Sequence, residues 1–555
     1  MQVKIALEEQ VNLDKKFIES KLAEFSHIVE IEEKFIQFEY KDETFYLFPN
    51  FDGIPEICVL TNQIKSYPHF CLYKSLQYKE FNFYSICLYV SDEISFYNAT
   101  YQEKFEFIIE QFIRLMNLNE YELEKEVMSE YRYHWNKISE SFVYSNISPL
   151  DSINNIHMFE YRRKKDKKPT KKYILSKNFP FETSIYSYTQ INCLYLDIID
   201  MKGILPPPFK TWDIKLLKDL LFSIKRKRFD EEICKYLSHY NVKEKVFIFL
   251  RIPQFNYFEI GIKVTFSNDE KCKLKSKLNQ IESITFIEVS NRNMETSIIR
   301  NGGIPVECKK VLMIGCGSLG SYIVRELPKI GVNNITIVDG DNLEYSNLSR
   351  HMLGEMFVGR NKAISMCDLL SIEYESMKFN AINQYVVDSN IDDIINDKSN
   401  YDLIIITTGN EDLQYKLNKQ LISLKKFIPT IFCWLESHSI GSHTLVMKNE
   451  FSGCYNCLMN ANLNYIKNST KQIRYNGCGG VYSQYGTNIL LNTSALIVDI
   501  ISAWSSIKSN ILYSYKTKNI INSIEGIQFT ERYYEDEYGI NVIENLKNKE
   551  CDCCD

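Results

Sequence analysis

Apolar and polar positions follow two different spacings over residues 1–160. A spacing of three to four in "LDKKFIESKLAEF", "YQEKFEFIIEQFIRLMN" and the more charged "EYELEKEVMSEYRYHWNKI" predicts helices. A spacing of two in "FIQFEY" and "TFYLFP", and the apolar run "ICVL", predict short strands. Helices and strands in this order are typical of a small α+β domain, which we predict for residues 1–160.

Residues 161–295 show a less regular pattern. They open with the basic run "YRRKKDKKPTKKY" at 161–173. Its charge and its proline predict an exposed linker or loop, with contact to an acidic partner as the less favoured alternative. Strand-like "CLYLDIID" and "KVFIFLRI" flank a proline-rich turn and the helical "WDIKLLKDLLFSIKRKRF". The pattern predicts a second α+β domain, and no residue in it indicates a reaction.

Continuous apolar runs replace the alternation over residues 296–555. The runs "KVLMIGCG", "NITIVDGD", "YDLIIITTG" and "IPTIFCWL" predict buried strands, and helical stretches separate them. Buried strands that alternate with helices are typical of a doubly wound parallel sheet. The fold class of this region is therefore predicted to be α/β with a Rossmann-like sheet.

Composition limits the partners and the cellular compartment that we expect for these domains. A net charge of -6 and a pI near 5.9 argue against nucleic acid as the main partner. The apolar runs are too short for a membrane span, and the first residues lack the apolar core of a signal peptide. Sixteen cysteines without an export signal are typical of thiols in a reducing cytosol. We expect a cytoplasmic protein with no membrane contact.

The stretch "VLMIGCGSLGS" carries the first chemical signal. Gly315, Gly317 and Gly320 would let the backbone approach a phosphate at the start of a helix. Asp339, at the end of the next predicted strand, is placed to bind ribose hydroxyls. These residues fit a nicotinamide cofactor and ATP equally well.

The residues that follow favour ATP. Asn347, Arg350 and Lys362 are phosphate-binding groups for which a nicotinamide enzyme has no use. When a carboxylate attacks the α-phosphate of ATP, negative charge builds on the phosphoryl oxygens and pyrophosphate leaves. Cationic donors and a metal ion at that charge lower the barrier. The pattern therefore predicts ATP-dependent activation of a carboxylate.

The block "GCGSLGS…VDGDNLEYSNLSRHMLGEMFVGRNKA", followed by "YDLIIITTGN", resembles the ThiF/MoeB superfamily of ubiquitin-activating-type adenylyltransferases. The resemblance implies that Asp339, with Asp341 beside it, holds the ribose, that Asn347 and Arg350 meet the phosphates, and that Lys362 reaches the triphosphate. It also implies Mg²⁺. The family often has an Asp-Asn pair for this ion, whereas this chain has Gly409-Asn410, with Asp412 as a candidate substitute. Arg300 is a candidate for the family's arginine that reaches a neighbouring subunit.

Two C-x-x-C pairs suggest a metal. Cys454 and Cys457 form one pair, and Cys551 and Cys554 form the other near the end of the chain. Four thiolates suit tetrahedral Zn²⁺, and the family resemblance also points to zinc. Cys553 is an alternative to either member of the second pair.

Two further cysteines suit nucleophilic chemistry. Glycines flank Cys478 in "RYNGCGGVYSQYG", and the family resemblance implies a catalytic cysteine after the first zinc pair. Cys87 comes after strands and a turn and before a long predicted helix, an order that resembles the ubiquitin-conjugating fold. The usual His-Pro-Asn element is missing, and His69 stands near its place. The alternatives are an ordinary loop cysteine at 478 and a buried strand cysteine at 87.

A conjugating-like domain ahead of an activating domain resembles the fused enzymes of bacterial ubiquitin-like conjugation operons, including antiphage CBASS systems. This resemblance implies a homodimer whose partners are a ubiquitin-like protein or the C-terminus of a target such as a cGAS-like nucleotidyltransferase, and an acceptor lysine. A sulfur-carrier adenylyltransferase is the first alternative, and it gives residues 1–295 no role. A non-catalytic assembly protein is the second, supported by Gly409. A nicotinamide oxidoreductase is the least favoured.

Overall fold

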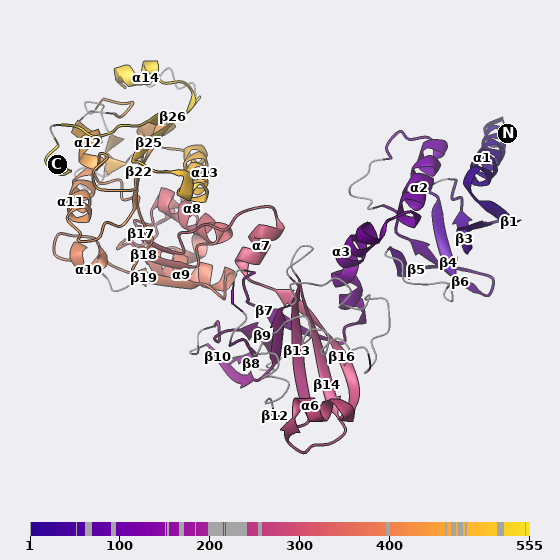
Figure 1. The fold of residues 1–555 in the computed structure, drawn as a ribbon. Helices are drawn as coiled ribbons and strands as arrows, with labels where there is room; N and C mark the ends of the chain where they lie inside the picture. Colours follow the sequence, from indigo (N-terminus) through magenta and orange to yellow (C-terminus); the bar gives the residue numbers. More distant parts are fainter. Residues whose placement is uncertain are drawn as a thin grey trace. The chain divides into compact units, whose positions relative to one another are not determined.

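The computed structural model describes residues 2–51, 53–60, 69–89, 96–149, 151–152, 155–165, 171–181, 183, 185–197, 215, 217, 241–252, 258–395, 400–460, 463–467, 473–474, 481–482, 485–518, 527–549 and 551–554 (Figure 1). The chain divides into two compact units. The first comprises residues 1–144, 153–158 and 190–290, and the second comprises residues 145–152, 159–189 and 291–555.

The first unit begins with an antiparallel sheet of six strands. The strands are ordered β1-β2-β3-β4-β6-β5 and comprise β1 (His27–Ile31), β2 (Ile36–Tyr40), β3 (Glu43–Phe48), β4 (Glu56–Leu60), β5 (Phe70–Tyr78) and β6 (Phe81–Ile86). The three strand predictions from "FIQFEY", "TFYLFP" and "ICVL" are thereby confirmed.

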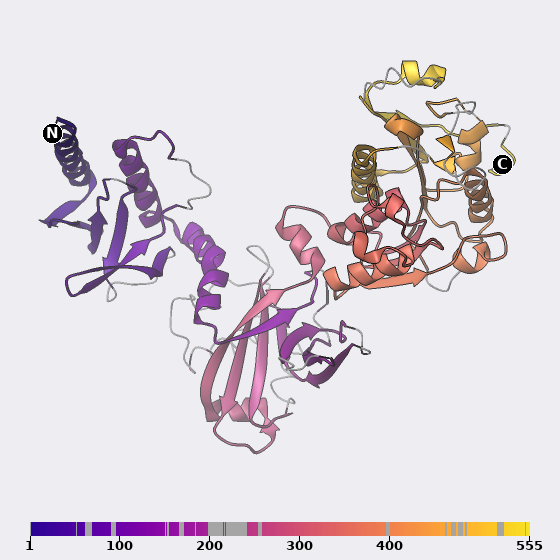
Figure 2. The same ribbon diagram turned by 180° about the vertical axis from the view of Figure 1, so that it is seen from behind.

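Helices α1 (Gln2–Phe25) and α2 (Tyr101–Met116) pack on one face of this sheet (Figure 2). Their buried side chains join those of the strands in one core, which includes Leu22, Phe38, Phe45, Phe105 and Phe112. Helix α2 begins at a capping box, in which the Thr100 side chain accepts from the Glu103 amide and the Glu103 carboxylate accepts from the Thr100 amide.

The first unit continues with a second core. Strands β13 (Lys245–Ile252), β14 (Phe258–Phe266) and β16 (Ile281–Asn291) are antiparallel neighbours, and β11 (Leu194–Asp197) runs parallel to β13. Helix α3 (Glu120–Ile138) buries Tyr131 and Trp135 among them, and the Trp135 indole donates to the carbonyl of Ile287 at 3.0 Å. The domain boundaries at 160 and 295 stay predictions, and within the first unit α3 packs with these later strands.

The basic run at 161–173 differs from its prediction. Its first residues end β8 (His157–Arg163), and Lys172 and Tyr173 begin β9 (Lys172–Ser176). Strand β10 (Tyr186–Ile191) is the other neighbour of β8. The prediction of an exposed linker or loop was wrong for residues 161–163, 172 and 173, because charge alone does not distinguish a loop from the exposed ends of two strands. The helix predicted from "WDIKLLKDLLFSIKRKRF" lies outside the described residues except for Lys215 and Leu217.

The second unit is built on a sheet of eight strands. Five parallel strands come first, in the order β19 (Lys378–Ile382), β18 (Asn334–Val338), β17 (Lys310–Ile314), β20 (Leu403–Ile406) and β21 (Thr430–Leu435). Three antiparallel strands extend it, namely β22 (Gly441–Met447), β25 (Ile511–Lys516) and β26 (Gly539–Ile543).

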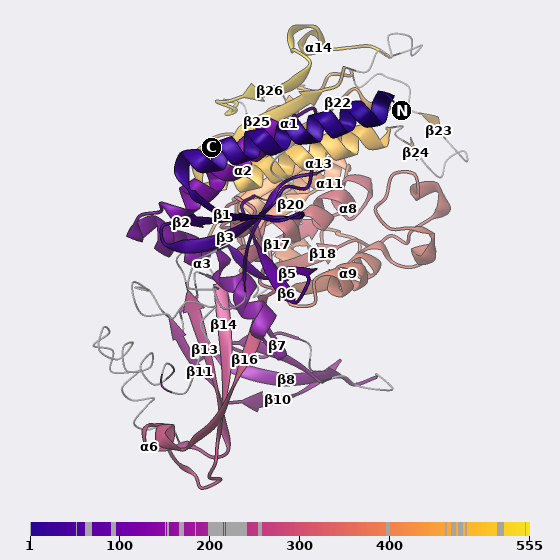
Figure 3. The same cartoon turned by 90° about the vertical axis from the view of Figure 1, so that its right-hand side faces the viewer.

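Helices cover both faces of this sheet (Figures 1 and 3). One face packs against α8 (Ser318–Glu326), α9 (Lys362–Glu373) and α13 (Thr487–Ser502), and the other against α10 (Ile391–Ile395), α11 (Glu411–Ile422) and α12 (Tyr455–Asn460). Successive residues of β17 alternate between the two cores, which explains why its sequence is apolar throughout. The predicted doubly wound α/β fold is confirmed.

Among the described helices, none combines the length and the apolar character that crossing a lipid bilayer requires.

Candidate functional site

A glycine loop joins β17 to α8 at the carboxyl ends of the parallel strands. Gly315 has a φ of +94°, a backbone conformation that residues other than glycine rarely adopt. Its carbonyl accepts a hydrogen bond from the Thr407 hydroxyl at 2.8 Å. A Cβ at Gly320 would lie 2.2 Å from that carbonyl oxygen, so the helix could not approach the strand as closely. At Gly317 an added Cβ meets no atom within 4 Å, which leaves this side of the loop open.

Asp339 holds this loop from the end of β18. Its carboxylate accepts the amide of Cys316 at 2.7 Å and the amide of Asp341 at 2.8 Å. Burial raises the pKa of the Asp339 carboxyl, and these two hydrogen bonds together with the charge of Lys362 oppose the rise. Asp339, the residue predicted to bind the ribose, is therefore already oriented by hydrogen bonds from the loop that would receive the phosphates.

His351, which sequence reasoning missed, supports the same loop. Its Nδ1 accepts the amide of Leu353 at 3.1 Å, so its Nε2 carries the proton and donates to the carbonyl of Cys316 at 2.8 Å. Burial lowers the pKa of His351 to about 4, and the neighbouring charge of Lys362 acts in the same direction. Near pH 7 the imidazole is therefore uncharged, and it stabilises the loop through its hydrogen bond to the carbonyl of Cys316.

Asn361 connects the other parts of the site. Its side-chain amide donates to the carbonyls of Asp339 and Asp341 at 2.9 and 3.0 Å and to the side chain of Asn383 at 2.7 Å. Its Oδ1 accepts the amide of Ile364 and so caps α9. This single buried side chain fixes the start of α9, and with it Lys362, against the segment that carries the two aspartates.

Lys362 is buried at the first position of α9. Its ammonium lies 3.0 Å from one oxygen of the exposed Asp341 carboxylate, and the Tyr385 hydroxyl donates to the other oxygen at 3.0 Å. The hydrogen bond to Asp341 raises the pKa of Tyr385. Lys362, the residue predicted to bind the triphosphate, therefore forms an ion pair with Asp341 in this structure. The ion pair holds the ammonium group at the site.

Asn347 and Arg350 lie in the segment between Asp341 and α9. The side chain of Asn347 accepts the amide of Glu344 at 3.2 Å within a short 3-10 turn, η4 (Tyr345–Asn347). The guanidinium of Arg350 lies over the ring of Tyr485, 5.4 Å from its centroid. The structure thus places both predicted phosphate ligands in the segment that also contains His351.

The magnesium candidate lies after β20. Gly409 has a φ of +65°, Asn410 caps α11 by accepting the amide of Leu413 at 3.0 Å, and Asp412 is exposed in the first turn of that helix. Asn410 and Asp412 line a hollow of about 490 Å³ together with residues that follow β19. The carboxylate of Asp412 is therefore available as an oxygen ligand for Mg²⁺ at this edge of the sheet, two residues beyond Asn410 in the chain.

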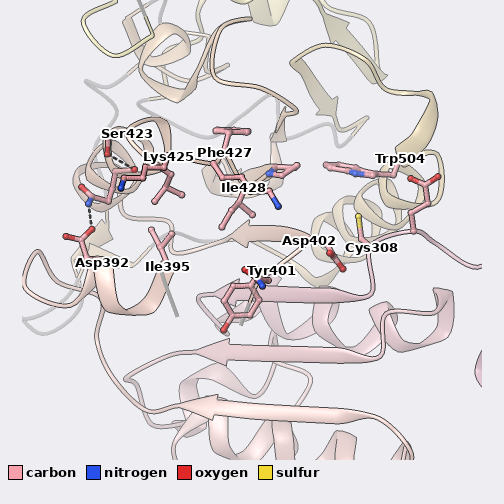
Figure 4. A pocket seen from close by; sticks show the side chains of 16 residues that line it. Cys308, Asp392, Ile395, Tyr401, Asp402, Ser423, Lys425, Phe427, Ile428 and Trp504 are labelled. Atoms are coloured by element: carbon pink, nitrogen blue, oxygen red, sulfur yellow. Dashed lines mark hydrogen bonds between the residues drawn. The ribbon is translucent and has the colours of Figure 1, made fainter. Parts of the chain in front are cut away.

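A larger hollow of about 920 Å³ lies at the opposite edge of the sheet (Figure 4). Cys308 and Asp402 come just before β17 and β20, and Ile428 comes just before β21, so this hollow lies at the amino ends of the strands. Nucleotides bind at the carboxyl ends in open α/β sheets. Size therefore does not identify the site here, and the ligand-binding groups point to the smaller hollow and the glycine loop.

The two C-x-x-C pairs meet in one buried cluster. The Sγ atoms of Cys454, Cys457, Cys551 and Cys554 all lie within 4.8 Å of one another. Three of the separations are 3.9, 3.7 and 3.3 Å. A tetrahedral zinc with Zn–S bonds of about 2.3 Å holds its sulfurs about 3.8 Å apart, so the donor set and its geometry fit this ion.

Cys553 lies outside this cluster of four. Its sulfur accepts from the side-chain amide of Asn456 at 2.7 Å and lies 3.3 Å from the carboxylate of Asp552. Burial raises the pKa of the Cys553 thiol to about 12. Gly453 turns the chain into the first pair at a φ of +102°, where a Cβ would lie 2.6 Å from Leu546. The structure thus favours Cys551 and Cys554 over the alternative ligand.

Of the two predicted nucleophiles, Cys478 and Cys87, the structure describes only Cys87. Cys478 lies outside the described residues. Cys87 follows β6 and is half-buried, and its amide donates to the carbonyl of His69 at 2.7 Å. The His69 ring lies 3.1 Å from the carboxylate of Glu126 on α3. The backbone of His69 is thus a neighbour of the Cys87 backbone, and the roles of both side chains stay predictions.

Sequence reasoning missed three polar residues of the nucleotide site, namely His351, Asn361 and Tyr385. Two of them had a local signal, because asparagine is a residue type that commonly caps helices and His351 directly follows Arg350. Tyr385 follows β19, which has no motif. Its role depends on the neighbouring position of β18 and β19 in the sheet.

A doubly wound sheet with a glycine loop at the carboxyl ends of its parallel strands is the architecture of nucleotide-binding α/β proteins. The ThiF family profile matches residues 291–533, so the chain contains a ThiF family domain. The resemblance found in the sequence is thereby confirmed.

Relatives with a curated description include two proteins named "ATP-dependent ubiquitin transferase-like protein Cap2". The protein of Enterobacter hormaechei is 48% identical over 66 residues, which are 12% of this chain and 11% of the relative. The protein of Pseudomonas aeruginosa is 24% identical over 225 residues, 39% of this chain and 38% of the relative. The chain thus matches well under half of the length of either relative. Among solved structures, E. coli MccB with succinimide is 17% identical with a TM-score of 0.33, covering 44% of this chain and 67% of that one.

Proposed function

We propose that this protein activates the C-terminal carboxylate of a partner protein by adenylation with ATP. The observation that carries the proposal is the joint placement of Asp339, Asp341 and Lys362 against an open glycine loop, in a ThiF family domain. Asp339 holds the ribose, and Arg350 and Lys362 take the negative charge of the phosphates. Mg²⁺, when bound, neutralises charge on the triphosphate, and Asp412 is the carboxylate available to hold it.

The chemistry proceeds by two displacements. The substrate carboxylate attacks the α-phosphorus, a carbon-bound oxygen becomes bonded to phosphorus, and pyrophosphate leaves. The thiol of Cys478 then attacks the acyl carbon, a C–S bond forms, and AMP leaves as the C–O bond breaks. In this structure Lys362 is paired with Asp341, so binding of the triphosphate exchanges one anionic partner for another. The exchange avoids leaving a buried ammonium unpaired.

The acyl group then passes to Cys87 and from there to the amine of a lysine on the acceptor protein. The relatives named ubiquitin transferase-like proteins support a transfer step after activation. Thioester exchange is nearly neutral in free energy, whereas formation of an amide is downhill. Two thiols on one chain have an effective mutual concentration of about the millimolar range when the chain permits contact.

The partners follow from the same resemblance. The activated protein is a ubiquitin-like protein or a target with an extended C-terminus, such as a cGAS-like nucleotidyltransferase of an antiphage conjugation system. We further propose a homodimer of ThiF domains, because closed two-fold pairs are the commonest assemblies of soluble proteins. Light scattering at micromolar concentration checks the dimer, and a monomer would contradict it.

Two assays test the proposal. The first measures exchange of labelled pyrophosphate into ATP with Mg²⁺ and a glycine-ended ubiquitin-like protein from the same genome. The second is a non-reducing gel of the variants with ATP and that protein. Cys478→Ala should form adenylate and load neither cysteine, whereas Cys87→Ala should accumulate a thioester on Cys478 and give no lysine conjugate. Normal conjugates from Cys87→Ala would show that Cys87 does not carry the acyl group, and absence of exchange would refute the adenylation step.

A further inference from the structure

Two buried asparagines lie beside the four-sulfur cluster. Asn418 on α11 has no exposed surface, and Asn456 on α12 is 2% exposed. The two helices are neighbours on the same face of the sheet (Figure 1). Burying a side-chain amide costs free energy unless its donors and its acceptor find partners. The partners of these two amides therefore show what the buried side chains hold in place.

Asn418 holds the two residues that separate the cysteines of the first pair. Its Oδ1 accepts the backbone amide of Tyr455 at 3.2 Å, and its Nδ2 donates to Oδ1 of Asn456 at 3.1 Å. Tyr455 and Asn456 are the two residues between Cys454 and Cys457. Because the backbone between two cysteines sets the directions of both sulfurs, α11 fixes the turn that presents the first pair.

Asn456 continues this connection to the second pair. Its Nδ2 donates to the sulfur of Cys553 at 2.7 Å. Cys553 stands between Cys551 and Cys554 in the chain, and its own sulfur lies outside the cluster of four. One hydrogen bond therefore joins the middle of the first C-x-x-C turn to the middle of the second.

A third buried asparagine fixes the chain that enters the first pair. Oδ1 of Asn510 accepts the amides of Lys448 and Asn449 at 2.6 and 3.1 Å, and its Nδ2 donates to the carbonyl of Gly453 at 2.6 Å. Gly453 directly precedes the first cysteine of the cluster. The first turn is thus held from α11 on one side and from the start of β25 on the other.

The amide is the residue type that this place requires. Four thiolates around one Zn²⁺ keep a net negative charge, which is costly in a buried site. A carboxylate at position 418 would add to that charge, and an apolar side chain would leave the buried amide of Tyr455 unsatisfied. Asparagine offers a donor and an acceptor without any charge, so it can orient the turn at no electrostatic cost.

We propose that Asn418 and Asn456 are positioning residues of the metal centre, which set the arrangement of the two C-x-x-C pairs before the ion binds. An ion that meets a preassembled set of sulfurs spends less of its binding energy on ordering the chain. Neighbours that orient metal ligands in this way typically contribute about 10–100-fold in metal affinity. The inference concerns metal binding and does not rest on the adenylation reaction.

The first measurement is the zinc affinity of the full-length protein, by competition with a chromophoric chelator and with Zn²⁺ as the only added ligand. We expect Asn418→Leu and Asn456→Leu each to weaken zinc binding by about 10–100-fold. Gln414→Leu is the matched control, because it removes another buried amide from α11 one turn earlier, and it should bind zinc as the wild type does. Wild-type affinity in both asparagine variants would overturn the proposal.

A second measurement separates positioning from general stabilisation of the fold. Co²⁺ replaces Zn²⁺ in sites of four thiolates, and its visible absorption bands depend on how the sulfurs surround it. We expect altered bands in Asn418→Leu and Asn456→Leu and wild-type bands in Gln414→Leu. Unchanged cobalt spectra in variants that only melt earlier would show that the asparagines stabilise the fold alone, and would overturn the proposal.

The half-exposed Cys553 decides the question if the leucine variants do not fold. Cys553→Ser keeps an acceptor for the Asn456 amide and should keep wild-type zinc affinity, whereas Cys553→Ala loses that acceptor and should bind zinc about tenfold more weakly. Equal affinities for the serine and alanine variants would overturn the proposal. None of these measurements uses ATP or a protein substrate, so a failure of pyrophosphate exchange would leave their outcome unaffected.

Discussion

The glycine-loop site and the four-sulfur cluster occupy the same unit but are stabilised in different ways. In the loop, each important polar side chain already has partners from the chain, as Asp339, His351 and Asn361 illustrate. In the cluster, four buried sulfurs lie within 4.8 Å of one another, and the Cys457 sulfur also accepts the amide of Asn548 at 3.4 Å. Thiols crowded in this way gain little from one another, whereas a zinc ion would satisfy all four.

The difference shows which site depends on its ligand. The loop is preorganised, so ATP binding spends little of its energy on ordering the chain. The cluster joins residues that are about a hundred positions apart, so the binding energy of an ion held there would be folding energy. A change in the loop should therefore affect mainly activity, and a change in the cluster should affect mainly stability.

The largest effect is expected at the cluster. The double variant Cys454→Ser, Cys457→Ser should lose about one zinc per chain and the cooperative unfolding of the second unit, because apparent zinc-binding energies reach about 10–16 kcal/mol. Metal analysis and thermal unfolding measure both. Cys553→Ser is the matched control and should keep its zinc, since Cys553 lies outside the cluster. A folded, zinc-free double variant would contradict the four-thiolate site.

The next effect concerns the loop. Asp339→Ala and Lys362→Ala should each reduce pyrophosphate exchange by about a hundredfold or more, because each removes a group that positions or stabilises the reacting phosphates. Their melting temperatures should change much less than that of the cluster variant. Lys329→Ala, which removes a surface lysine paired with Glu326, is the control and should be fully active. Exchange that survives in both loop variants would refute the site.

An intermediate effect is expected from pH on the stability of the second unit, through the protonation of His351. The folded pKa of His351, about 4, lies below its ordinary 6.5, so the unfolded chain binds this proton first as the pH falls. The stability from a neutral His351 is complete above about pH 6.5 and is lost as the pH falls toward 4, with about 2 kcal/mol gone at pH 5. Unfolding of the second unit at pH 7 and pH 5 measures it. His351→Gln should reduce this slope, and an unchanged slope would contradict the assignment; the exposed His27→Gln serves as control.

The smallest effect is expected at the rim of the loop site. Tyr385→Phe removes one exposed hydrogen bond to Asp341 and leaves the ion pair with Lys362 in place. An exposed bond of this kind contributes about 0.5–1 kcal/mol, so the KM for ATP in the exchange assay should change by less than about fivefold. A loss as large as that of Lys362→Ala would show that Tyr385 itself contacts the nucleotide.

The sequence by itself determined the local parts of both sites. The glycine loop, Asp339 and Lys362 stand in one continuous stretch, where strand, turn and helix have fixed spacings, so their relation can be predicted from neighbouring residues. Each C-x-x-C pair is likewise local, because two cysteines three residues apart can bind one ion from a single turn. The doubly wound sheet was predictable for the same reason, since apolar runs that alternate with helices leave few other topologies.

Only the tertiary structure decided which distant groups meet. It brought Cys551 and Cys554 to Cys454 and Cys457 and left Cys553 outside, placed Tyr385 on Asp341, and used His351 to hold the carbonyl of Cys316. It also gave His438 and Ser439 left-handed backbone angles, which no motif around them in the sequence indicates. Contacts of this kind depend on strand order and helix packing, which bring residues into contact without regard to their separation in the sequence, so local patterns carry no signal for them.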